Sequence, residues 1–192
     1  GITGAGVYRS SDNGQSWTLV NQGLGELTAK SLAATETSLL AGTLGGNLFR
    51  SVNQGQSWMP SGAGLRVTYT SAVISNNGVT LASTGGVYRS PDNGQSWTPA
   101  NTGLEGKFIE GFGVNGTTFF AGAVIDENNA TSVFRSTDQG RTWMAASNGL
   151  PPDNFLQFAV VGNTLYAGAG RPFYGITGAG VYRSSDNGQS WT

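Results

Sequence analysis

The sequence predicts an all-β protein built from repeated four-stranded units, and three observations support this. Glycine makes up 31 of the 192 residues, whereas only 11% of residues are charged and the chain has just two lysines. Short runs of Thr, Val, Tyr, Phe and Trp alternate with Gly, Asn and Ser, a composition typical of strands and turns rather than of amphipathic helices. A nine-residue pattern recurs five times, which indicates a repeat architecture.

Charge and residue usage exclude several classes of function. The net charge of -1 gives no electrostatic basis for binding nucleic acid or an anionic membrane. The chain contains neither Cys nor His, so it has no thiol nucleophile, disulfide, imidazole base or ordinary zinc site, and we expect no cofactor. No apolar stretch reaches the 18 residues of a membrane span. The first residues lack the features of a signal peptide, so we expect a mature chain or an excised segment.

The repeated pattern reads R-S-x-[DN]-[NQ]-G-[QR]-[ST]-W. Its tryptophans are 41, 39, 46 and 48 residues apart, an average of 43.5. This length fits four short strands with their turns, which is the size of one propeller blade. The five copies are Arg9–Trp17, Arg50–Trp58, Arg89–Trp97, Arg135–Trp143 and Arg183–Trp191.

Apolar segments between the copies supply the other strands of each unit. We expect innermost strands, called strand A, at residues 29–35, 67–74, 108–114 and 155–161, each followed by a strand B that contains Ala and then Gly or Ser. Strand C is the Val-Tyr-Arg or Phe-Arg segment at the start of each copy of the pattern, and strand D starts at the Trp of that copy. The predicted division is a C–D hairpin at 1–18 and blades at 19–61, 62–100, 101–147 and 148–192.

The pattern resembles the Asp-box, or BNR repeat, whose motif S-x-D-x-G-x-[ST]-W is matched residue by residue in four copies. The resemblance covers essentially the whole chain. It implies β-propeller blades, as in sialidases, xyloglucanase-type glycosidases, sortilin-type receptors and photosystem II assembly factors of the Ycf48 type. Such a repeat is specific for fold and says little about function.

The box residues are predicted to be structural. At the C–D turn a short Asp or Asn accepts hydrogen bonds from backbone N–H groups, and Gly takes a positive φ. Asn in the second copy keeps the acceptor oxygen. Each Trp is expected to lie over its hairpin or between sheets, burying about 150–250 Å². These residues are Asp12, Gly14, Trp17, Asn53, Gly55, Trp58, Asp92, Gly94, Trp97, Asp138, Gly140, Trp143, Asp186, Gly188 and Trp191.

The repeated arginines have two interpretations. They could form an anion-binding ring, but we expect each to cover an aromatic ring or to pair with a box carboxylate. The five are Arg9, Arg50, Arg89, Arg135 and Arg183.

A catalytic centre is not predicted. The sialidase resemblance would require three converging arginines, and only Arg66, Arg141 and Arg171 lie outside the repeated position, with Arg141 inside a box. A glycosidase of the xyloglucanase type would instead need two carboxylates about 5 to 9.5 Å apart. Asp126 and Asp153 are the aspartates outside the boxes, and nothing selects a pair. A fragment of a propeller glycoside hydrolase remains the alternative.

Two long B–C loops could bind a ligand. Phe173 and Tyr174 beside Arg171 would suit a sugar or a protein partner, as in a lectin-like binder, whereas Asp126 and Glu127 could hold calcium. The competing interpretation is an ordinary solvated loop in each case, and no metal is assigned.

The two ends of the chain carry the same sequence. Residues 1–18 are identical to residues 175–192, including the GITGAG that precedes the motif. A C–D hairpin followed by four units makes eighteen strands, or about four and a half blades, so ring closure leaves one hairpin over. A longer tandem array, or an engineered overlap that allows domain swapping, would explain this.

An unpaired blade edge predicts head-to-tail association, as a ring or a filament. We therefore predict a non-enzymatic scaffold or recognition module that self-associates. The family resemblance places it outside the cell or in the periplasm.

Overall fold

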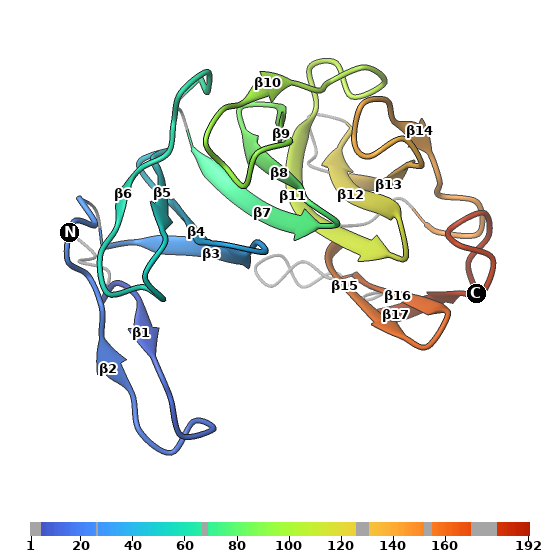
Figure 1. Ribbon diagram of the computed structural model, residues 1–192. Coiled ribbons are helices and arrows are strands. Elements are labelled where there is room, and N and C mark those ends of the chain that lie inside the picture. The colour runs from blue at the N-terminus through green and yellow to red at the C-terminus, as the bar shows by residue number, and fades with distance from the viewer. Residues whose placement is uncertain (1–4, 26, 67–68, 126–130, 152–154, 170–179) are drawn as a thin grey trace. The chain divides into compact units, whose positions relative to one another are not determined.

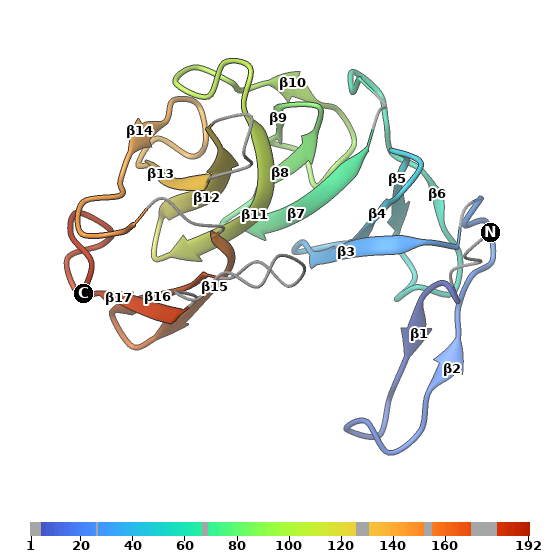
Figure 2. The ribbon, with the colours of Figure 1, turned by 180° about the vertical axis from the view of Figure 1, so that it is seen from behind.

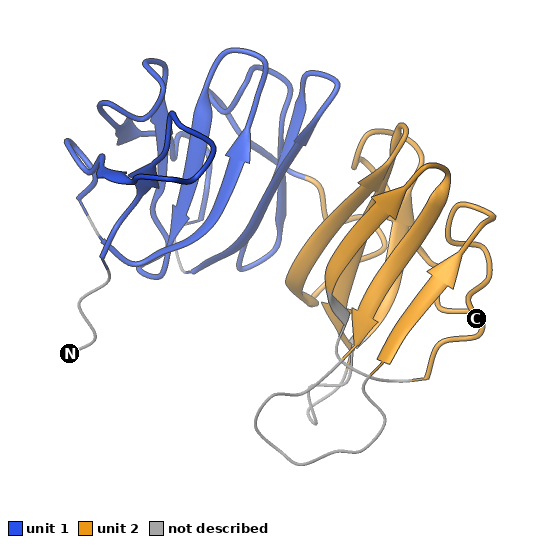
Figure 3. Ribbon diagram, turned by 90° about the horizontal axis from the view of Figure 1, so that it is seen from below, with its two compact units in different colours: residues 1–99 blue, residues 100–192 orange. Residues whose placement is uncertain are grey.

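The computed structural model describes residues 5–25, 27–66, 69–125, 131–151, 155–169 and 180–192. These residues form seventeen β-strands in two compact units, residues 1–99 and 100–192 (Figure 3). The described part contains no helix able to cross a membrane.

Unit 1 contains three antiparallel sheets (Figure 1). The first is a two-stranded hairpin, and the other two are four-stranded meanders in chain order. The hairpin comprises β1 (Tyr8–Arg9) and β2 (Thr18–Leu19). The second sheet comprises β3 (Ala29–Ala34), β4 (Leu39–Thr43), β5 (Leu48–Ser51) and β6 (Met59–Pro60). The third comprises β7 (Thr70–Asn76), β8 (Val79–Thr84), β9 (Val87–Ser90) and β10 (Thr98–Pro99).

Unit 2 contains two further meanders (Figure 2). The four-stranded sheet comprises β11 (Phe108–Asn115), β12 (Thr118–Val124), β13 (Thr131–Ser136) and β14 (Met144–Ala145). The three-stranded sheet comprises β15 (Phe155–Val161), β16 (Thr164–Ala169) and β17 (Gly180–Ser184).

The predicted all-β fold class is confirmed, with differences in detail. The strand expected from residue 67 starts at Thr70 in the described residues. The D strands begin one residue after the Trp. Before β6, β10 and β14 the backbone N–H of this Trp bonds to the preceding loop instead of to the ladder. Seventeen strands appear instead of eighteen: in the last repeat Thr192 only exchanges two backbone hydrogen bonds with Arg183.

The core of each unit lies between its consecutive sheets. Along a strand B the side chains alternate, so that successive residues face opposite sides of the sheet. Ala41 packs toward the β1–β2 hairpin, with Val7, Val20 and Trp58, whereas Leu40 packs toward the next sheet. Within a unit, consecutive blades therefore bury one another's faces.

Candidate functional site

Each box is a turn closed by its own serine and aspartate. In the first copy, the Ser10 hydroxyl accepts the Gly14 N–H at 2.8 Å and donates to Asp12 at 2.7 Å. Asp12 also accepts the Ser16 backbone N–H at 2.9 Å and the Ser16 hydroxyl at 2.5 Å. Asn13 and Gly14 both have positive φ, 56° and 85°. The turn thus uses two left-handed residues, whereas the sequence predicted only the glycine.

The same bonds hold the box carboxylates ionised. Hydrogen bonds from Ser16 and Ser10 lower the pKa of Asp12 to about 2. For Asp92 and Asp138 partial desolvation opposes the shift, but the hydrogen bonds outweigh it and lower the pKa to about 2. The pKa of Asp186 is lowered further by Ser190 and Ser184. These carboxylates act as fixed acceptors, so none is free to serve as a general acid near neutral pH.

Asn53 keeps this geometry without a charge. Its side-chain oxygen accepts the Ser57 N–H at 2.9 Å and the Ser51 hydroxyl at 2.9 Å, and its amide group donates to the Ser57 hydroxyl at 2.8 Å. The turn therefore needs an acceptor at this position and does not need an anion.

Four box tryptophans connect their repeat to the preceding loop. Each indole N–H donates to the carbonyl three residues after the preceding Trp, and each backbone N–H donates to the carbonyl five residues after it. The indole partners are Val20 for Trp58 (2.8 Å), Ser61 for Trp97 (2.9 Å), Ala100 for Trp143 (3.2 Å) and Ala146 for Trp191 (2.8 Å). The backbone partners are Gln22, Ala63, Thr102 and Asn148, at 2.8–3.1 Å.

A glycine makes room for this contact in every loop. Gly64 has φ +89°, and a Cβ built there would lie 2.3 Å from the Trp97 carbonyl oxygen. The recurring glycine one residue after the backbone acceptor is thus required both by its φ and by the close approach of the next tryptophan. The equivalent residues are Gly23, Gly103 and Gly149.

Three of the repeated arginines bond to backbone carbonyls, whereas we expected each to cover an aromatic ring or to pair with a box carboxylate. Arg9 donates to the Gln54 carbonyl at 3.2 Å, Arg50 to the Asn93 carbonyl at 3.0 Å and Arg135 to the Asn187 carbonyl at 3.3 Å. Each acceptor is the first positive-φ residue of the following box. That conformation turns a carbonyl toward the preceding repeat, so these arginines join one repeat to the next.

Among the described residues, the first box differs from the other four in the surroundings of its tryptophan. Trp17 is 62% exposed, whereas the other four box tryptophans are 3–4% exposed, so the expected burial of this ring is wrong. Its indole N–H turns back to the Gly14 carbonyl of its own box at 3.2 Å. Among the described residues β1 pairs only with β2, and Tyr8 and Leu19 are also exposed.

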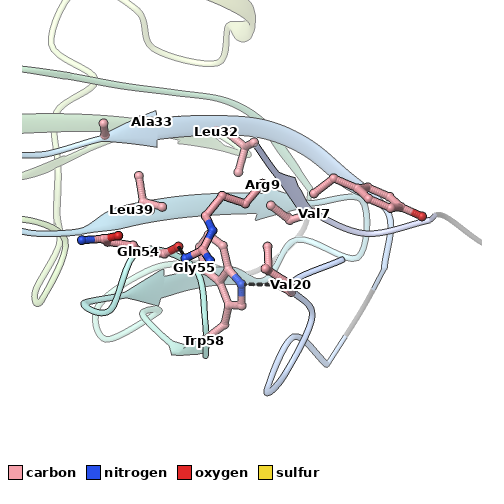
Figure 4. A pocket seen from close by; sticks show the side chains of 11 residues that line it. Val7, Arg9, Val20, Leu32, Ala33, Leu39, Gln54, Gly55 and Trp58 are labelled. Carbon is pink, nitrogen blue, oxygen red and sulfur yellow. Dashed lines mark hydrogen bonds between the residues drawn. The ribbon is translucent and has the colours of Figure 1, made fainter. Parts of the chain in front are cut away.

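An apolar cavity of about 240 Å³ lies between this hairpin and the β3–β6 sheet. Figure 4 shows Val7 and Val20 of the hairpin facing Leu32, Leu39 and Trp58 across it. Leu32 lies on β3, the edge strand at the start of its sheet, and is 57% exposed. Among the described residues the β1–β2 hairpin is a two-stranded sheet, with no A and B strands beside it.

The predicted ligand-loop residues lie outside the described part of the chain, namely Asp126, Glu127, Arg171, Phe173 and Tyr174, together with Asp153. Among the described carboxylates outside boxes, Glu105 accepts the Gly103 N–H, and burial raises the pKa of Glu110. The described residues contain no group of three or more metal-ligating side chains. The repeated pattern contains the box serine, but its role in closing the turn was not predicted, and neither was the close approach at the loop glycines.

Sheet order and box geometry define a β-propeller protein. The chain belongs to the DUF6242 β-propeller domain family, whose model matches residues 2–192. No curated protein sequence matches the chain.

Solved structures with this fold include the GH74 xyloglucanase from Xanthomonas campestris, 15% identical with a TM-score of 0.74 over 99% of this chain and 34% of that one. Ycf48 bound to the D1 peptide is 16% identical with a TM-score of 0.64, over 96% of this chain and 60% of that one. The computationally designed Ika4 protein is 11% identical with a TM-score of 0.58, over 82% of this chain and 92% of that one. This chain therefore spans about a third of the xyloglucanase, and these likenesses concern the fold.

Proposed function

We propose that this protein is a non-enzymatic propeller module that self-associates through the exposed edge of its β1–β2 hairpin and acts as a scaffold or recognition domain. The observation that carries the proposal is the contrast between Trp17, at 62% exposure, and its four buried equivalents. An exposed aromatic ring beside an unpaired strand edge is a surface that favours another strand pair.

The chemistry of the described residues supports a structural role. The box carboxylates and three of the repeated arginines are engaged in bonds that hold turns and link repeats. A propeller of similar fold, Ycf48, is seen with a bound peptide, which supports a recognition role for such modules. The family resemblance of the boxes favours an extracellular or periplasmic location.

Sedimentation of the full chain over a range of concentrations tests the proposal, with Trp17→Ala as the comparison. We expect species heavier than the 19.8 kDa chain that form with increasing concentration and that weaken in the variant. Trp17 is more exposed than the other box tryptophans, so we expect its truncation to leave the strands folded. A wild-type chain that stays at 19.8 kDa at every concentration would refute self-association.

A further inference from the structure

The duplicated hairpin provides a direct template for the missing neighbour. Residues 175–192 repeat residues 1–18 in full, so β17 has the same sequence as the segment containing β1. In the C-terminal copy this segment pairs antiparallel with β16: Leu165 lies opposite Ser184, Tyr166 opposite Arg183 and Ala167 opposite Tyr182. In the N-terminal copy the corresponding edge has no strand beside it among the described residues.

We propose that the open edge of β1 binds the β15–β16 strand pair of a second copy of this chain, in the place which that copy's own β17 otherwise occupies. This inference rests on the proposed self-association and adds its occupant and register. By sequence identity, Ser10, Arg9 and Tyr8 take the positions of Ser184, Arg183 and Tyr182 opposite the second copy's β16.

The exchange also supplies the bonds that Trp17 lacks. Trp191 donates its indole N–H to the Ala146 carbonyl and its backbone N–H to the Asn148 carbonyl. In the exchanged arrangement Trp17 makes both bonds to the second copy and becomes buried, while the second copy's Trp191 is released. Because the incoming and the displaced hairpins have the same sequence, their replacement alone leaves the free energy of association nearly unchanged.

An apolar packing contact present only in the assembly favours the exchange. The second residue of strand B packs on the innermost strand of the following blade: the rings of Phe120 and Phe158 lie 6.3 Å apart. Tyr166 in β16 is equivalent by register to Phe120 in β12. Leu32, opposite Ala41, is equivalent to Phe158, opposite Ala167. Tyr166 of the second copy would therefore cover the exposed Leu32 and close the cavity beside it.

Disulfide trapping tests the register, because the chain contains no cysteine of its own. Opposed residues in an antiparallel pair have Cα atoms about 4.5–5.5 Å apart, within the range of a disulfide. Full-length Tyr8→Cys and Ala167→Cys chains are mixed and oxidised with oxidised glutathione. The double variant Ala167→Cys/Tyr182→Cys is the matched control for closure within one chain, and Gln15→Cys, at the exposed tip of the first box, replaces Tyr8→Cys as the off-register control.

We expect the Tyr8→Cys and Ala167→Cys mixture to form a covalent dimer at least tenfold faster than the Gln15→Cys mixture, and the double variant to close as a monomer. Chains that sediment as assemblies but do not cross-link in this register would overturn the inference and leave self-association intact. Chains that neither sediment together nor cross-link would refute both.

Two tryptophan variants give a second readout with opposite signs. Trp17→Ala weakens the incoming hairpin and should lower the association constant. Trp191→Ala weakens the hairpin that has to be displaced and should raise it. A Trp191→Ala variant whose association constant is unchanged or lower would overturn the exchange, because the C-terminal hairpin would then not be displaced on association.

Discussion

Replacement of Trp97 by Ala tests whether the box tryptophans stabilise the repeats. Trp97 is 3% exposed, and burying an aromatic side chain of this size removes about 150–250 Å² from water. At about 25 cal/mol per Å² this is about 4–6 kcal/mol, an upper bound that agrees with the 3–5 kcal/mol typical of such truncations. We expect Trp97→Ala to lower the free energy of unfolding by about 3–5 kcal/mol.

The matched control is Trp17→Ala in the same unit. Trp17 is 62% exposed, so its truncation removes about a third as much buried area and should cost about 1–2 kcal/mol. Urea unfolding followed by far-ultraviolet circular dichroism measures both, at a concentration where the chain sediments as a monomer. Equal costs for the two variants would refute the claim that contact with the preceding loop stabilises the box.

Two further predictions concern the turns and the loops. Asp92 has a pKa of about 2 in the folded protein and about 3.9 in the unfolded chain. Its contribution to the free energy of unfolding is therefore present above about pH 4 and is lost as the pH falls toward 2. In this window the free energy of unfolding should depend less on pH in Asp92→Asn and more on pH in Asn53→Asp. The same pH dependence in both variants and in the original chain would contradict this. Gly64→Ala places a Cβ against the Trp97 carbonyl and should cost at least about 2 kcal/mol in urea unfolding. Gly106→Ala, also at positive φ but with no atom within 4 Å of its Cβ, should cost about 1 kcal/mol, and equal costs would refute the close-approach argument.

The repeats, the strand order and the turn position of the boxes could be predicted because each depends on local sequence. A short acceptor, a positive-φ residue and an aromatic at fixed spacing define the same turn wherever they occur. The exchange of Asp for Asn53 could also be interpreted from the side chain alone, since the turn needs an oxygen acceptor.

The environments of Trp17 and Trp191 could not be predicted in this way. Both lie in the same 18-residue sequence, yet one is exposed and the other buried, because burial depends on the repeat that precedes each of them. The arginine partners were missed for a similar reason: the acceptor is a backbone carbonyl of the next box, which leaves no signal in side-chain chemistry.

The indole N–H signals of the five tryptophans test the central claim most directly. Hydrogen exchange is followed by nuclear magnetic resonance, with Trp17→Phe and Trp191→Phe used to assign the signals. At concentrations where the chain is a monomer, we expect four protected indoles and rapid exchange at Trp17. As assemblies form, protection should pass to Trp17 and leave Trp191. A Trp17 indole that is already protected in the monomer, or that stays unprotected in the assembly, would contradict the account.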